Sequence, residues 1–206
     1  MESMMLAILV IAVGAIVRVA GPSFGKAGNM KLAGYGLMLG GVALAGLNTV
    51  VVIGVGEVGV KHFLGNVDAR PLDQGVHVVN PLASVEKMSI REQSFPPGSG
   101  VENIEAQTSE QMNVALEVSL LFRLDPLRAA DLFDRIGSEE QIKSSIVLNA
   151  IRNGVRDAVA TKSINQIFSP DRREVADDMK AAIQDKAGDR IEVIEVFLRD
   201  VQAPTA

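Results

Sequence analysis

The strongest constraint on this chain is a run of 25 residues, 32–56, that contains no charged side chain. Its polar side chains are Tyr35, Asn48 and Thr49. At about 1.5 Å of rise per residue, a helix of this length exceeds the roughly 30 Å thickness of the hydrocarbon core of a bilayer. A core helix of a soluble protein rarely needs such length without a charge, so the run predicts a membrane span over 32–56.

A second apolar stretch, residues 4–17, precedes this run and ends before Arg18. Its length of 14 residues fits a short or tilted first helix, a segment lying in one leaflet, or the apolar core of a signal peptide. The absence of positive charge in residues 1–3 argues against a signal peptide. We therefore expect residues 1–56 to be membrane-embedded, as a helical hairpin or as a re-entrant piece followed by one span.

The link between the two apolar stretches carries Arg18, Lys26 and Lys31 and no acidic residue. Positively charged flanks favour the cytoplasm, so we expect the chain after Gly56 to lie on the opposite, non-cytoplasmic face. Lys61 and Arg70 near the other end reduce the difference to three charges against two.

Two glycines in the long run, Gly36 and Gly40, have the spacing that lets two membrane helices approach closely, and Gly41 and Ala45 beside them have the same spacing. We therefore expect Gly36 and Gly40 to be helix-packing residues. The alternative is that glycine is simply frequent in membrane helices.

The remaining residues, 57–206, are enough for one domain with its own core. They contain 17 Lys and Arg against 24 Asp and Glu. This negative balance lacks the electrostatic footprint of a nucleic-acid-binding protein, and it argues against flat adhesion of the domain to anionic lipid. The chain has no cysteine, which excludes disulfides and thiolate sites.

The pattern of this part changes from strands to helices at Pro126. Strands are expected near 58–67, 76–79 and, from strict alternation, 112–124, with a turn at 71–75 and a loop at 94–100. A helix over 127–136 should stop at Gly137, and Ser138 with Gln141 forms a capping box. Another helix is expected from Ser169-Pro170 and a closing strand over 191–201.

One buried helix face should contain Ile142, Ile146, Ala150, Ile151, Val155 and Ala158. We predict an α+β domain over 57–202, with helices on one side of a small antiparallel sheet, and a tail at 203–206.

No motif in the chain predicts catalysis. Gly54, Gly56 and Gly59 match the dinucleotide-binding fingerprint, but a strand rather than a helix is expected to follow, so we reject it. His62 and His77 lack partners at ligand spacing. We expect no catalytic, cofactor-binding or metal-binding residues.

The ordered series of short motifs along the chain resembles a known family. The motifs are Gly-Glu-Val-Gly-Val at 56–60, Phe-Leu-Gly-Asn-Val at 63–67, Arg-Pro-Leu-Asp-Gln-Gly-Val-His-Val-Val-Asn-Pro at 70–81, Val85, Met88 with Ser-Ile-Arg at 89–91, Thr108, Phe-Arg-Leu at 122–124, Ile-Arg at 151–152, Arg-Arg-Glu-Val at 172–175 and Phe-Leu-Arg-Asp-Val at 197–201. This order is similar to the SPFH family of stomatin, prohibitin, flotillin and HflK/C, and resembles most the bacterial prohibitin-like members.

The resemblance implies a non-catalytic scaffold anchored in a membrane, expected to be the bacterial inner membrane. Such a protein would assemble with itself into a ring or cage and organise membrane proteins and lipids, without a cofactor. The alternative is a regulatory subunit that restrains an AAA-type, FtsH-like membrane protease. For self-assembly, we expect Glu139, Lys143 and Arg152 to form charge contacts between subunits, unless they belong to ordinary solvated helix faces.

Two features depart from the family pattern. Members usually continue after the last strand with a long charged helix that drives oligomerisation, whereas this chain stops at Ala206. Either the sequence is a truncated form, or assembly rests on the domain and the span. The two apolar segments also look more like the hairpin of stomatins than like the single span of many prohibitins.

Overall fold

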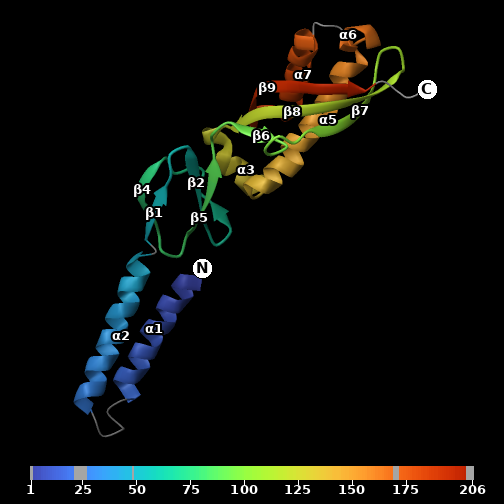
Figure 1. Ribbon diagram of the computed structural model, residues 1–206. Helices are drawn as coiled ribbons and strands as arrows, with labels where there is room; N and C mark the ends of the chain where they lie inside the picture. The colour runs from blue at the N-terminus through green and yellow to red at the C-terminus, as the bar shows by residue number, and fades with distance from the viewer. Residues whose placement is uncertain (1, 21–26, 48, 169–171, 203–206) are drawn as a thin grey trace.

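The computed structural model describes residues 2–20, 27–47, 49–168 and 172–202. Figure 1 shows an elongated arrangement, with a helical hairpin at one end, a small β part next to it and a larger part of strands and helices at the far end. The predicted α+β class is confirmed. The expectation of one small sheet is wrong, because the strands of the described residues form three separate sheets.

The hairpin consists of α1 (Glu2–Ala20) and α2 (Ala27–Leu47), which lie side by side (Figure 1). Their backbones are close together at glycines. A Cβ atom on Gly14 would lie 2.9 Å from the main-chain nitrogen of Met38, and one on Gly34 would lie 2.9 Å from the carbonyl oxygen of Gly14. Among the residues that the structure describes, we find no helix with both the length and the apolar character needed to cross a membrane.

The predicted continuous helix over 32–56 is wrong in its last part. Helix α2 ends at Leu47, and β1 (Val50–Ile53) follows, pairing antiparallel with β4 (Gly75–Val78). The physical reason is the run of four β-branched residues, whose side chains are restricted in a helix and pack well in a strand. The folded domain therefore begins at β1, before the expected boundary at residue 57.

Next to β1, a second sheet forms around β2 (Glu57–Phe63), which pairs with β3 (Asn66–Val67) and β5 (Ser84–Ser89). Val58, Val60 and Met88 form its buried side. Because a strand and not a helix follows Gly56, the glycine pattern at 54–59 has no helix N-terminus to hold a pyrophosphate.

The third sheet is built on β8 (Asn113–Leu124), and all its pairings are antiparallel. On one side of β8 lie β7 (Glu102–Gln107) and β6 (Gln93–Phe95), and on the other lies β9 (Ile191–Gln202). The strands predicted at 112–124 and 191–201 are confirmed. Strand β6 includes the first two residues of the predicted 94–100 loop.

Helices α5 (Leu148–Ala160) and α7 (Arg172–Ala187) pack against each other and cover one face of this sheet (Figure 1). They can approach closely because position 154 is glycine, where a Cβ would lie 2.7 Å from the main chain of Ile183. The six predicted buried residues between 142 and 158 are all buried. The helix start predicted at 169–170 lies outside the described residues.

Shorter helical segments connect the end of β8 to α5 and then α5 to α7. They are the 3-10 turn η2 (Pro126–Arg128), α3 (Ala129–Arg135), α4 (Glu139–Ile142), the π-helical segment η3 (Lys143–Val147) and α6 (Ile164–Phe168). Gly137, with a φ of 109°, makes the turn after α3 that side-chain-bearing residues disfavour. The predicted capping box is present, with the Ser138 N–H donating to Gln141 Oε1 at 2.8 Å.

Candidate functional site

The helical hairpin presents large apolar side chains on its exposed faces. Leu6, Leu9, Ile16, Leu32 and Leu39 are each more than half exposed. A helix that is apolar on its outward faces is normally surrounded by protein or by lipid. The hairpin surface is therefore the first candidate interaction site, and it fits an apolar environment.

The glycines of α2 divide into two groups. Gly34 and Gly41 face α1, where a Cβ on Gly41 would lie 2.5 Å from Ile11 Cγ1. At the two glycines expected to pack helices, Gly36 and Gly40, a Cβ would point into open space, with no neighbouring atom within 4 Å. Packing within the chain thus uses Gly41 of the second pair with this spacing, and a contact of Gly36 and Gly40 with another chain stays a prediction.

The ribbon of β1 and β4 adds a second apolar surface directly after the hairpin. Val50 lies opposite Val78, and Val52 lies opposite Val76. These four side chains, which we call the valine face, are between 50% and 79% exposed. On the other side of the ribbon Ile53 is buried and contacts the backbone at Gly59. The valine face and the hairpin together make this end of the molecule strongly apolar.

A carboxylate joins the small β part to the helical part. Glu139, the first residue of α4, accepts hydrogen bonds from the Ser89 N–H at 2.8 Å and from Gln93 Nε2 at 2.9 Å. Lys143 forms an ion pair with it at 2.7 Å. Burial alone would raise the pKa of Glu139, but the hydrogen bonds from Lys143, Ser89 and Gln93 lower it below its ordinary value.

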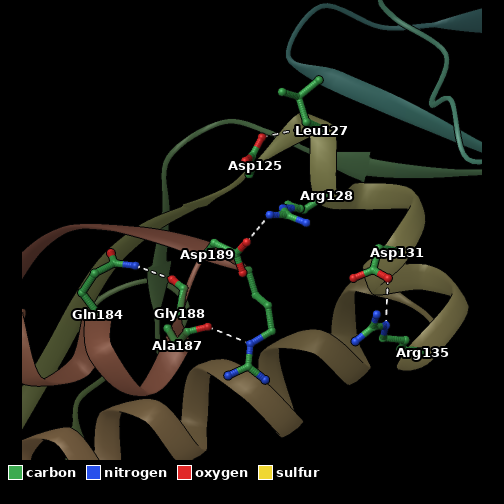
Figure 2. A network of polar contacts seen from close by, with 10 residues as sticks. Asp125, Leu127, Arg128, Asp131, Arg135, Gln184, Ala187, Gly188 and Asp189 are labelled. Carbon is green, nitrogen blue, oxygen red and sulfur yellow. Dashed lines mark hydrogen bonds and ion pairs between the residues drawn. The ribbon is translucent and has the colours of Figure 1, made fainter.

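A second polar network lies where β8 ends and β9 begins (Figure 2). Arg128 in η2 forms an ion pair with Asp189 in the turn between α7 and β9. At the start of η2, the Leu127 N–H donates to Asp125 Oδ1 at 2.9 Å. This network fixes the connection between the end of the central strand and the last turn of the domain.

The charged residues predicted to contact other subunits pair within the chain. Glu139 and Lys143 bind each other, and Arg152 Nη2 lies 2.7 Å from Glu102 Oε1 on β7. Their role between subunits stays a prediction. The Glu139 network and the Glu102 partner were not found from sequence, because each joins residues about 50 positions apart.

The two histidines have ordinary structural surroundings. The His62 ring lies 5.1 Å from the Phe133 ring, and His77 Nε2 lies 2.7 Å from the Asp73 carbonyl oxygen. In the described residues, His, Asp and Glu side chains do not gather into a group of three that could hold a metal ion.

In this chain an α+β domain follows closely on an apolar helical hairpin. In the comparison with protein families, residues 51–206 match the model described as SPFH domain / Band 7 family. The comparison with curated proteins gives no match. Because the family match covers more than half of the chain, the protein belongs to the SPFH domain / Band 7 family. Its members are generally membrane-associated, non-catalytic scaffolds.

Proposed function

We propose that this protein is a non-catalytic membrane scaffold. Its hairpin is embedded in a lipid bilayer, and its SPFH domain is held at the bilayer surface, where copies assemble into a ring or cage that organises membrane proteins and lipids. The observation that carries this proposal is the exposed apolar surface of α1 and α2, together with the valine face that continues from it. Moving a large aliphatic side chain such as Leu6 or Leu39 from water into an apolar environment is favourable by up to about 1.5–3 kcal/mol.

The short connection between α2 and β1 supports the assembly part of the proposal. Strand β1 begins at Val50, close after the end of α2 at Leu47. A domain held so close to a bilayer meets its neighbours side by side, which raises their effective concentration. The bilayer face occupied by the domain remains a prediction from the basic loop, namely the non-cytoplasmic face.

The proposal is tested by purifying the full chain from membranes and inserting it into lipid nanodiscs. We expect flotation with the lipid and a mass of many subunits by light scattering. Protein that separates from lipid, or a monomer in nanodiscs, would contradict the proposal. The alternative, a regulator of an AAA-type membrane protease, predicts co-purification with a larger membrane enzyme instead of a large assembly of this chain alone.

A further inference from the structure

Strand β9 lies at the margin of the third sheet (Figure 1). One of its edges pairs with β8 over residues 191–202. Within the described part of the chain, no strand pairs with its other edge. An edge strand of 12 residues offers a long row of main-chain groups to another strand. Natural proteins either block such edges or use them.

The first part of this edge is blocked by a side chain. The Val193 N–H donates to Gln184 Oε1 at 2.8 Å, and Gln184 Nε2 donates to the Ile191 carbonyl oxygen at 3.0 Å. The amide of Gln184 thus occupies the backbone groups at 191 and 193 as a neighbouring strand would. Figure 2 shows the same amide donating to the Gly188 carbonyl oxygen in the preceding turn. In the described structure, the main chain of 194–202 makes no hydrogen bond apart from its ladder with β8.

The rest of the strand has register shifts at Ile194 and Arg199 in its ladder with β8. Between and at these shifts it carries a symmetric row of exposed side chains. Glu195, Phe197 and Arg199 are exposed, and the Arg199 guanidinium lies 5.8 Å from the centre of the Phe197 ring, so these two share one face. Phe197 is 37% exposed. In the residues that the structure covers, neither Glu195 nor Arg199 has an ion-pair partner. An acid therefore precedes the phenylalanine by two positions, and a base follows it by two.

We propose that β9 pairs antiparallel with β9 of a second copy of this chain, about a two-fold axis at Phe197. In this register Glu195 of each copy lies opposite Arg199 of the other, so two ion pairs flank a contact between the two Phe197 rings. Opposite charges and aromatic pairs at directly opposed positions stabilise strand pairing. A two-fold interface needs such a self-complementary surface. Parallel pairing in register would instead set Glu195 against Glu195, which is unfavourable.

This inference rests on the proposed function for its self-association, and it names the partner and the interface. Two antiparallel chains joined in this way form one continuous sheet across the two copies. A two-fold contact closes at two copies, so the proposed ring or cage needs a second, different contact between such pairs. The hairpin is not part of the contact, so β9 pairing and membrane attachment can be tested separately.

Disulfide trapping in the full chain tests the contact, because the protein has no native cysteine. In the variant Phe197→Cys, the two cysteines would have Cα atoms about 4.5–5.5 Å apart, within the range that a disulfide bridges. We expect most of the nanodisc-inserted protein to form a covalent dimer on mild oxidation. Glu192→Cys is the matched control, since it is exposed on the same strand but far from the axis, and we expect it to form no covalent dimer.

Charge reversal in the Phe197→Cys background tests the register. Glu195→Arg sets two cations opposite each other, and we expect it to lower the dimer yield several-fold, as should Arg199→Glu. The double exchange of Glu195→Arg with Arg199→Glu should restore the yield. Absence of the Phe197→Cys dimer, or failure of the double exchange to rescue, would overturn the inference.

These results separate the two proposals. A large assembly in lipid without the Phe197→Cys dimer would reject β9 pairing and leave the membrane scaffold standing, with copies meeting through another surface. A dimer trapped at residue 197 in protein that does not float with lipid would reject the membrane scaffold and leave the β9 contact standing.

Discussion

At the scale of single residues, Glu139 is one of the residues that join the two parts of the SPFH domain. Its side chain is only 15% exposed, and its carboxylate binds groups from β5, β6 and the following helical turn. Its pKa is lowered, so protonation is less favourable in the folded state than in the unfolded state. The stability that it contributes is complete above the unfolded pKa of about 4.3 and is lost as the pH falls through the lower folded pKa.

We therefore predict that Glu139→Gln lowers the free energy of unfolding at pH 7 by about 1–3 kcal/mol, since a charged partner of two hydrogen bonds is removed. The difference from the wild type should shrink as the pH falls below about 4. Urea unfolding followed by circular dichroism measures it. The control is Glu140→Gln, at an exposed neighbouring position. An equal loss for both variants, or a difference independent of pH, would show that Glu139 is not the joining residue.

The glycines of α2 give a second prediction at this scale. Gly41→Val should separate the two helices, because its Cβ would meet Ile11, whereas Gly40→Val should leave the hairpin closed. Spin labels at positions 9 and 39 on the two helices report the separation by pulsed electron resonance. A wider distance distribution is expected for Gly41→Val alone. If Gly40 contacts another chain, as predicted from the sequence, Gly40→Val should reduce the mass of the assembly instead.

At the scale of elements, the contact of α5 with α7 depends on the small size of position 154. We predict that Gly154→Ala destabilises the domain by about 1–3 kcal/mol, since its Cβ would lie 2.7 Å from the backbone of Ile183 and the helices would have to move apart. The matched control is Asn153→Ala, on the exposed side of the same helix. Thermal unfolding compares the two. Equal transition temperatures would mean that the two helices separate without cost.

The valine face gives a further prediction for an element. If the β1–β4 ribbon touches the bilayer, an environment-sensitive fluorophore on Val78→Cys should emit at shorter wavelength once the protein is in lipid. The same label on Glu105→Cys, exposed on β7 at the far part of the domain, should emit as in water. If the label emits at the wavelength typical of water at both positions, the ribbon does not contact the lipid.

Helices and strands whose apolar residues recur at a regular spacing could be predicted from the sequence. The boundaries and contacts between elements could not. The alternation in β8 and the buried face of α5 each reflect one local pattern, so their positions are confirmed. Strand β1 was missed because hydropathy alone does not distinguish valines in lipid from valines in a ribbon. The signal that could have revealed it is the β-branched run at 50–53.

Contacts between residues far apart in the chain could not be predicted from the sequence either. Arg152 was expected to face another subunit, and its ion pair with Glu102 depends on α5 lying beside β7. Gly36 and Gly40 fit a general spacing rule, but which glycines face α1 depends on the rotation of the two helices about their axes. The family was nevertheless predicted correctly. That prediction rested on the order of many short motifs, so a wrong secondary-structure assignment for one element did not change it.

At the scale of the whole molecule, an apolar hairpin, an apolar ribbon and an acidic domain follow one another in one line along the chain (Figure 1). The charge of the chain, −5, adds no electrostatic attraction to anionic lipid. In the proposed scaffold, attachment to a bilayer comes from apolar burial of the hairpin, and the basic residues Arg18, Lys26 and Lys31 are not its main source. This predicts that binding to lipid is insensitive to salt, in contrast to a protein held by basic residues.

Quenching of a fluorophore by brominated lipid tests membrane embedding of the hairpin most directly. A label on Leu39→Cys, which is 71% exposed on α2, is placed in nanodiscs whose lipid acyl chains carry bromine. A hairpin embedded in the bilayer predicts strong quenching at position 39 that persists in high salt, and no quenching of the same label on Glu105→Cys. Equal, weak quenching at both positions would place the hairpin outside the hydrocarbon and contradict the membrane scaffold.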